Sequence, residues 1–357
     1  MTVRIQIEPV WRFTQERDSR SMLVMLDFLN EIREAGTISH AAERADVSYR
    51  HAWNLIEKWS AFFGTPLVTR RKGRGTTLTA FGERLVWAGQ RLQARLGPQL
   101  QNVAQELESE INTFLPEVAS PVRIQASHGF AVSALRELLS RESDLTVDFR
   151  FVANTNSPRS LVRGDCDLAG MHLPQGELRD RSVAAWRDVL SSDTHCVIRF
   201  VTREMGLIVR KGNPLRLRSV KDLVRPGVRI VNRDPESGTR QLFDELLARD
   251  GIDPSRIVGY AQFEFTHAAV AAYVASGMAD VSFGVEAAAR QFDLDFVRLV
   301  TEDYVFVCER HSLEHPSVRR ILDVMRGAAF SDAIASLPGY SVTEPGTVRS
   351  LEELFSR

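Results

Sequence analysis

The sequence predicts a multidomain protein in which a small all-α domain with one β-hairpin, residues 1–79, precedes a larger α/β domain, residues 121–357. Three observations lead to this prediction. The length of 357 residues is enough for two or three domains, each with its own core. The first part of the chain has apolar residues at helical spacing. From residue 121 onward, short β-rich runs alternate with helical segments.

The first expected helix covers residues 20–35, where apolar residues recur every three or four positions. Its apolar face is formed by Met22, Met25, Leu26, Leu29 and Ile32. Gly36 ends this helix, and Ser48 opens a second one that stops at Gly64. The face of the second helix that would pack inward contains Ala52, Leu55, Ile56 and Trp59. Because the preceding short segment offers the small pair Ala41-Ala42, we expect two helices that meet at a tight turn.

A basic hairpin follows the helix pair. The β-prone runs LVTR and TTLT flank Lys72-Gly73-Arg74-Gly75, which is a turn signal. Residues 37–95 hold ten Lys and Arg against four Asp and Glu, a net charge of +6 in a chain that totals −1. The basic residues alone would suit a solvated loop, but with the helix pair they indicate a winged helix-turn-helix that binds DNA. The candidate DNA-binding residues are Ser39, Ser48, Tyr49, Arg50, Trp53, Asn54, Lys58, Arg70, Arg71, Lys72 and Arg74.

Residues 80–114 are expected to form a long helical segment with an apolar stripe. The stripe contains Leu85, Leu92, Leu96, Leu100, Val103 and Leu107. Gly97-Pro98 predicts a kink or a break within the segment. The stripe could belong to the core of the same chain, but after a DNA-binding domain it favours pairing of subunits. We therefore assign residues 80–120 as a dimerisation helix and hinge, and expect a homodimer or homotetramer.

The second half of the chain favours an α/β fold with largely parallel sheets. The expected strands are residues 122–126, 145–151, 166–170, 205–210, 228–231, 256–260 and 280–284. The spacing of Cys166, Cys196 and Cys308 fits no metal site and no disulfide framework. The sequence also has no G-x-S-x-G, P-loop, HExxH or GxGxxG motif, so neither catalysis nor a metal is expected. Because the sequence shows no secretory signal or membrane span, we expect a cytoplasmic protein.

The segment TISHAAERADVSYRHAWNLIEKW, with LVTRRKGRGTTLTAFGERL after it, resembles the winged helix-turn-helix of LysR-type regulators. It resembles even more closely that of the ModE family of molybdate-responsive regulators, through VSYRHAW and LTAFGERL. The second half does not resemble the small molybdate-binding barrels of ModE. It is similar instead to type II periplasmic-binding-protein-like domains, through NRDPESGTRQLFDELL, GYAQFEFTHAAVAAYVASGMADVSFG and GDCDLAGMHLP. This resemblance implies two lobes around a ligand cleft: lobe I at about 121–205 and 303–357, lobe II at about 206–302, with crossing strands near 205 and 303.

Several polar residues at strand and helix ends are candidates for the ligand cleft. Ser237 can cap a helix, and the free N–H groups of Gly238, Thr239 and Arg240 would then form an anion-binding nest. A capped helix with no ligand is the alternative, and a single histidine is more often structural than ligand-binding. The family resemblance favours binding. The candidate effector-binding residues are Ser127, His128, Asn154, Thr155, His172, Ser237, Gly238, Thr239, Arg240, Glu264, Thr266 and His267.

Residues and resemblance together predict a one-component transcriptional regulator whose cleft senses a small anion. The resemblance implies a molybdate- or tungstate-type oxyanion and control of molybdoenzyme-related genes, while a small carboxylate such as formate remains open. The expected partners are double-stranded operator DNA and the small-molecule effector, with no cofactor and no membrane. The alternatives are a cytoplasmic molybdate- or cofactor-handling accessory protein and an enzyme.

Overall fold

A computed structural model of the chain describes residues 3–15, 18–21, 23–71, 75–112, 114, 121–143, 145–152 and 157–355. The chain divides into two compact units. One unit is Ile7–Ala94, and the other combines Met1–Gln6 with Arg95–Arg357. We call them the head and the effector unit. None of the described helices is both long enough and apolar enough to cross a membrane.

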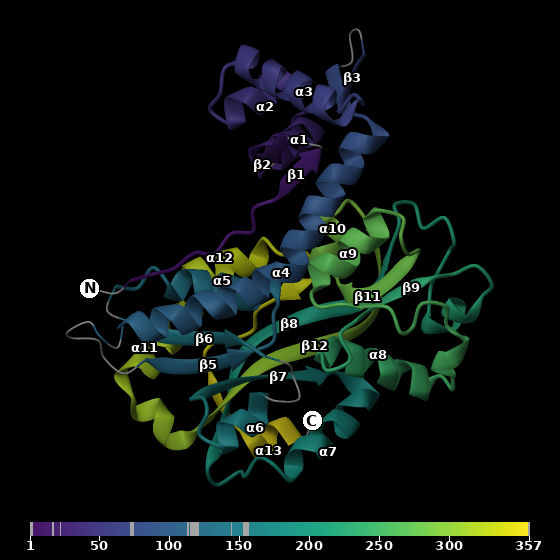
Figure 1. Cartoon of the computed structure of the whole chain (residues 1–357). Helices are drawn as coiled ribbons and strands as arrows, with labels where there is room; N and C mark the ends of the chain where they lie inside the picture. The colour runs from purple at the N-terminus through teal and green to yellow at the C-terminus, as the bar shows by residue number, and fades with distance from the viewer. Residues whose placement is uncertain are drawn as a thin grey trace. The chain divides into compact units, whose positions relative to one another are not determined.

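The head contains the predicted helices and hairpin, preceded by a second hairpin (Figure 1). Its elements are β1 (Arg12–Gln15), β2 (Asp18–Ser21), α1 (Leu23–Ala35), α2 (Ile38–Arg44), α3 (Tyr49–Phe63), β3 (Val68–Arg71), β4 (Gly75–Leu78) and the first part of α4 (Ala80–Asn112). Ser48 caps α3 by accepting a hydrogen bond from the His51 N–H, and Gly64 ends the helix with φ of 64°. The hairpin of β1 and β2 was not predicted from the sequence. It is held by Phe13, whose ring packs edge-on against Trp59 and Phe63.

Helix α4 excludes the predicted break at Pro98, while the alternative prediction, a kink there, stays a prediction. The helix is continuous over 33 residues and does not break at Gly97-Pro98. A proline inside a helix removes one backbone hydrogen bond and costs about 3 kcal/mol. On either side of Pro98, Arg95 and Asn102 each contact another part of the effector unit.

The effector unit is built on one ten-stranded sheet. The strands are β5 (Val122–Ala126), β6 (Val147–Phe151), β7 (Leu168–Pro174), β8 (His195–Val209), β9 (Ile230–Arg233), β10 (Phe263–Glu264), β11 (Val281–Val285), β12 (Asp295–Glu309), β13 (Tyr340–Ser341) and β14 (Val348–Ser350). Their order is β10-β9-β11-β8-β12-β7-β5-β6, and β13 and β14 also pair with β8. The pairs of β5 with β6 and β7, and of β9 with β10 and β11, are parallel, as predicted. The pairs that involve β8 or β12 are antiparallel, so the sheet is mixed and less parallel than predicted.

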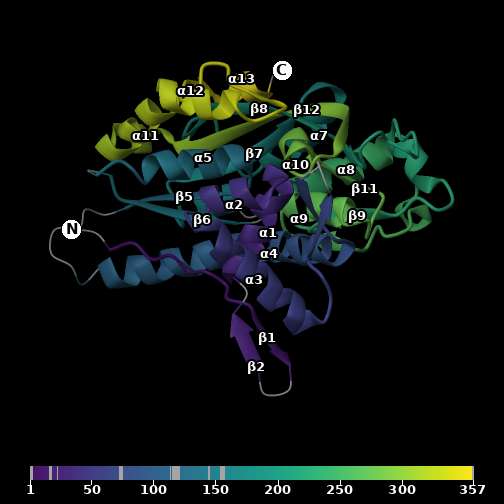
Figure 2. The ribbon, with the colours of Figure 1, turned by 90° about the horizontal axis from the view of Figure 1, so that it is seen from above.

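Helices cover both faces of this sheet in each of its two lobes. The helices are α5 (Phe130–Leu139), α6 (Ser157–Val162), α7 (Arg179–Arg187), α8 (Gly238–Arg249), α9 (His267–Ala275), α10 (Glu286–Gln291), α11 (Pro316–Arg326), α12 (Ala328–Ala335) and α13 (Leu351–Phe355). In the first lobe, α5 and α12 lie on one side of the strands and α6, α7 and α13 on the other (Figure 1). In the second lobe, α9 and α10 lie opposite α8 (Figure 1), and Figure 2 gives the view from above, along the direction that separates these layers.

Strands β8 and β12 connect the lobes. Each has 15 residues, and they run antiparallel to each other along their whole length. Both lobes share these strands, because β8 pairs with β14 at Val197 and with β11 at Leu207. The segments expected to cross between lobes, near residues 205 and 303, lie in these two strands.

One predicted strand is wrong. A strand was expected at residues 256–260. The chain instead forms a short 3₁₀ helix, Pro254–Arg256, and Val258 then makes a single β-bridge to Arg229. The chain bends at Gly259, whose φ is 89° and where an added Cβ would lie 2.2 Å from the Ile230 carbonyl oxygen. Such a backbone suits glycine and interrupts a strand.

Candidate functional site

The surface of α3 presents the predicted DNA-binding side chains to solvent. Ala52, Ile56 and Trp59 are buried on the inner face of the helix. The predicted residues Ser39, Ser48, Tyr49, Arg50, Asn54 and Lys58 are exposed, and Trp53 is half-buried. Ser48 is engaged in the helix cap, so its role is to position α3. The outer face of α3 can therefore enter a DNA groove without unfolding the core.

The side chain of Arg70, in the wing formed by β3 and β4, contacts two residues of α3. Its guanidinium donates a hydrogen bond to the Tyr49 hydroxyl and lies 3.9 Å from the centre of the Trp53 ring. Both contacts restrict a long cationic side chain, which lowers the entropy lost when it binds a phosphate. Arg71 ends β3, and the predicted residues Lys72 and Arg74 lie outside the described residues.

A second group of polar side chains gathers inside the effector unit, in the first lobe. The His172 Nε2 atom lies 2.5 Å from Ser127 Oγ, and its Nδ1 atom lies 3.0 Å from an Arg203 nitrogen. Arg203 also pairs with Glu302, at 2.7 Å from its Nε atom. The Tyr304 hydroxyl accepts a hydrogen bond from the Ser127 N–H, at 3.1 Å. Arg203 and Glu302 are directly opposite each other on β8 and β12.

The contacts of His172 favour one tautomer. Its Nδ1 atom lies 3.0 Å from an Arg203 nitrogen, which can only donate, and 3.3 Å from a Glu302 oxygen, which can only accept. The shorter contact makes Nδ1 the acceptor from Arg203 and places the ring proton on Nε2. The Nε2–H group then donates to Ser127 Oγ. Although Ser127, His172 and Glu302 lie in the order of a hydrolytic triad, this tautomer cannot take the proton of the serine hydroxyl. The arrangement suits binding and does not activate a nucleophile.

The second lobe contributes Arg233, His267 and Thr239. The Arg233 side chain is 5% exposed, and its Nη2 atom donates to the Phe265 carbonyl at 2.9 Å. Its Nε and Nη1 atoms are buried and have no hydrogen-bond partner among the described residues. His267 Nε2 lies 3.3 Å from Thr239 Oγ1, while its Nδ1 atom and that of His128 are buried without a partner in the described part of the chain.

Mutual electrostatic effects show that the two groups form one cluster. Burial and then Arg233 lower the pKa of His128 to about 4, and burial and then Arg203 lower the pKa of His172 to about 4. Burial, Arg233 and Arg203 hold the pKa of His267 well below its ordinary value. All three imidazoles are therefore neutral at pH 7.

The cluster keeps an uncompensated positive charge. Burial raises the pKa of Glu302, but Arg203 and His172 outweigh burial and bring this pKa down to about 2. Burial and repulsion from Arg203 lower the pKa of Arg233 to about 9, against the attraction of Asp234, so this guanidinium is still charged at pH 7. Its Nε and Nη1 atoms have no hydrogen-bond partner among the described residues. Arg203 and Arg233 thus share one fully buried carboxylate, that of Glu302, with the half-buried Asp234 nearby, and an anion would complete the site.

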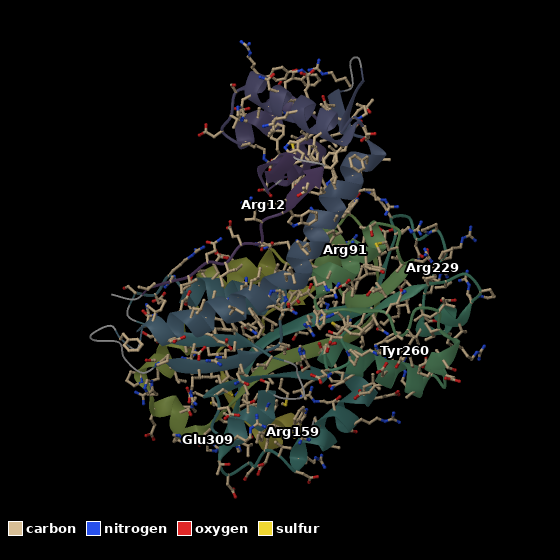
Figure 3. The ribbon with its side chains drawn as sticks, viewed as in Figure 1. Arg12, Arg91, Arg159, Arg229, Tyr260 and Glu309 are labelled. Carbon is tan, nitrogen blue, oxygen red and sulfur yellow. The ribbon has the colours of Figure 1, made fainter. Side chains whose placement is uncertain are left out.

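The structure places the sequence-predicted effector residues unequally. Ser127, His128, His172, Thr239 and His267 belong to the cluster, and Ser237 and Thr266 cap α8 and α9 beside it. The Arg240 N–H is taken by Ser237 Oγ, so the predicted nest is limited to Gly238 and Thr239. The Arg240 side chain pairs with Asp244 and stacks on Tyr260, which Figure 3 labels. Glu264 is buried and pairs with Arg95, while Asn154 and Thr155 lie outside the described residues.

Sequence reasoning missed Arg203, Arg233, Glu302 and Tyr304. A signal was present, because RFVTREMGLIV and VRIVNRDP each place arginines within apolar strand-forming runs. A charged residue within a buried strand requires a partner or a ligand. Among the described residues, no group of three or more His, Cys, Asp and Glu side chains is arranged to hold a metal ion.

The head thus carries a helix-turn-helix with a wing, and the effector unit has two lobes with a buried polar cluster. Residues 135–326 match the model of the PBP superfamily domain, and residues 23–83 match that of the bacterial regulatory helix-turn-helix proteins of the LysR family. The chain belongs to the PBP superfamily, and its residues 23–83 match a LysR-family helix-turn-helix.

Several named proteins are similar to this chain. It is 31% identical to the uncharacterized protein YvgK of Bacillus subtilis (strain 168) over 199 residues, which is 56% of this chain but only 64% of that relative. It is 40% identical to the transcriptional regulator ModE of Haemophilus influenzae over 62 residues, 16% of this chain and 24% of that protein. Among solved structures, a mutant of OxyR from Corynebacterium glutamicum with bound hydrogen peroxide has a TM-score of 0.46 at 15% identity. The similarity covers 88% of this chain and 94% of the OxyR chain.

Proposed function

We propose that this chain is a DNA-binding transcriptional regulator that senses a small anion bound between Arg233, Arg203 and the histidines of the effector cluster. The observation that carries the proposal is the Arg233 guanidinium, which is buried, charged and without a partner for its Nε and Nη1 atoms among the described residues. An unpaired charge in a protein interior costs several kcal/mol, and an anion supplied by the solution would offset this cost.

The surrounding groups support an anion, because most of them can donate hydrogen bonds. Burial raises the pKa of Tyr304 to about 12 and also raises the pKa of Tyr340, so both phenols keep their protons. The N-termini of α5, α8 and α9 begin at Gly129, Ser237 and Thr266, and their positive ends favour negative charge.

The space beside the cluster is small. Ser127, Gly129, Arg203, Tyr304 and Tyr340 line part of a cavity of about 10 Å³, which has room for about one water molecule. Pockets for drug-sized ligands are usually about 300–1,000 Å³, so only a very small ligand is proposed here, and the lobes would have to move apart to admit it. The proposed ligand is a molybdate- or tungstate-type oxyanion or a carboxylate as small as formate, and the ModE likeness of the head favours molybdoenzyme-related target genes.

A ligand screen on the full chain tests the proposal. Melting temperatures are measured with molybdate, tungstate, sulfate, phosphate, formate and small dicarboxylates, because a ligand that binds only the folded form raises the melting temperature. For the anion with the largest effect, R233Q should weaken binding about 30-fold or more. R229Q is the matched control, since Arg229 is exposed near the start of the same strand and pairs with Asp280. Equal affinities of R233Q and the wild type would refute the site.

The exposed apolar residues of α4 support a homodimer or homotetramer. Val103, Leu107 and Ile111 are 46%, 40% and 40% exposed, and Phe114, just beyond the helix, is 85% exposed. Spacings of four residues place the first three on one face of the helix. Water-exposed apolar stripes of this kind are usually covered by another surface, and we propose that a second subunit covers this one.

The remaining assignments also stay proposals. The functional parts are the DNA-binding domain 1–79, the linker 80–120 and the effector domain 121–357 with lobe I at about 121–205 and 303–357. Operator DNA is proposed as the macromolecular partner of α3 and the wing, and a cytoplasmic location follows from that partner.

A further inference from the structure

The C-terminal half of α4 is attached to the first lobe through Asn102. The Asn102 amide donates to the Phe151 carbonyl at 2.8 Å and accepts from the Phe151 N–H at 2.9 Å. Phe151 ends β6, which lies at the edge of the sheet, so its backbone groups have no strand partner on that side. One amide therefore satisfies both groups, as a neighbouring strand would. Figure 1 shows this half of α4 running beside β6 towards α9.

The same helix reaches the second lobe through Arg95. Its Nε atom lies 3.7 Å from the carboxylate of Glu264, and its guanidinium lies 5.9 Å from the centre of the Phe265 ring. Glu264 is 5% exposed, whereas the Arg95 side chain is 53% exposed. The attachment at Arg95 is therefore a partly solvated ion pair, weaker than the double hydrogen bond at Asn102.

Both attachment points adjoin the anion cluster. On the first lobe, the Phe151 ring lies 4.9 Å from the ring of His128. On the second lobe, the Phe265 carbonyl accepts the hydrogen bond of Arg233, and His267 follows two residues later. A ligand held between Arg233 and His128 would thus touch residues that themselves contact Phe265 and Phe151, next to the two anchors of α4.

We propose that Arg95 and Asn102 are positioning residues that make α4 a strap across the two lobes, and that the response to the anion passes through Arg95. The inference rests on the proposed anion-sensing function. Arg95 and Asn102 are separated by seven residues, about 10 Å along a helix that cannot stretch. When the lobes change their separation around β8 and β12, both anchors cannot stay in place.

When the lobes move, the weaker of the two contacts, the ion pair of Arg95 with Glu264, breaks first. The hydrogen bonds of Asn102 keep α4 on the first lobe, and the ion pair of Arg95 forms or breaks with the position of the second lobe. Because α4 continues without interruption from Asn102 to Ala80 in the head, the state of the Arg95 anchor is passed to the DNA-binding unit along one helix. Anion binding and the affinity for DNA are then coupled through one contact, the Arg95–Glu264 ion pair, which is either formed or broken.

The test measures operator affinity of the full chain with and without 1 mM sodium molybdate, on a duplex selected by this chain from a random pool. In the wild type the anion should change the dissociation constant at least about fivefold. In R95Q the change should fall below about twofold, and R95K, which keeps the charge, should restore most of it. R141Q is the matched control, because Arg141 pairs with Glu137 within the first lobe and is similarly exposed. An R95Q response equal to that of the wild type overturns the strap.

A second measurement needs no ligand. Hydrogen exchange of the full chain without anion should be at least about threefold faster in R95Q at residues 263–267, while the Phe151 amide, held by Asn102, keeps its rate. N102A should show the opposite pattern. Unchanged exchange in R95Q overturns the strap even where molybdate has no effect on the wild type. In that case the lack of a molybdate effect counts against the proposed function alone.

Discussion

Glu302 offers a quantitative test of the buried cluster. Its pKa falls from the ordinary 4.5 to about 2 through Arg203 and His172, against the opposing effect of burial. At about 1.4 kcal/mol per pKa unit, this difference corresponds to about 3 kcal/mol of stability at pH 7. Loss of one partner of a buried ion pair costs about 3–5 kcal/mol, which agrees with that value. We therefore expect E302Q to lower the free energy of unfolding of the effector unit by about 3 kcal/mol.

The assay follows thermal unfolding of the full chain at several pH values. A loss of about 3 kcal/mol should lower the melting temperature of a unit of this size by about 6–12 °C. Because the folded-state pKa of Glu302 is depressed, its contribution is fully present above pH 4.5 and is lost as the pH falls towards 2. The gap between E302Q and the wild type should narrow over that range. E344Q, which removes an exposed carboxylate paired with Arg199, should stay within about 1 kcal/mol. A similarly small effect of E302Q would refute the description of the cluster.

Four further outcomes are expected. Because the pKa of His128 is lowered to about 4 by burial and Arg233, its protonation should destabilise the anion-free protein as the pH falls from 6.5 to 4, and a bound anion should reduce this loss in melting experiments. N54A should weaken binding to the selected duplex at least tenfold at constant salt without changing anion affinity, whereas R12A, on the β1 hairpin, should bind as the wild type does. G75A should destabilise the head by more than 1 kcal/mol in melting experiments, because φ is 84° and the new Cβ would lie 2.4 Å from the Gly36 carbonyl oxygen. L107D should reduce the oligomer mass seen by sedimentation if α4 pairs two subunits, and an unchanged mass would exclude that face.

Local signals in the sequence predicted the head well. Ser48 and Gly64 bound α3 as helix caps, and Gly36 ends α1 with φ of 70°. Each of these residues acts on its own neighbours within three or four positions, which is the range that a sequence pattern can report. The hairpin of β1 was missed because Phe13 is stabilised by Trp59, far along the chain.

The candidate site was predicted only in part, for the same physical reason. Ser237 and Thr266 are helix caps with local signatures, and both lie where the sequence placed them. Arg203 and Glu302 are separated by 99 positions, and their pairing depends on the register of two strands. The spacing of residues along the chain does not reveal that register. The lack of a hydrogen-bond partner for Arg233 can likewise be recognised only when its neighbours in the folded chain are known.

The pairing of β8 has a consequence for the order in which the protein can fold during synthesis. β8 is completed at Val209, but its partners β11, β12, β13 and β14 are made only when the ribosome reaches Val281, Asp295, Tyr340 and Val348. The head closes through contacts within Ile7–Ala94 and can fold early. In a nascent chain the head could therefore be folded long before the effector unit has all the strands it needs to fold.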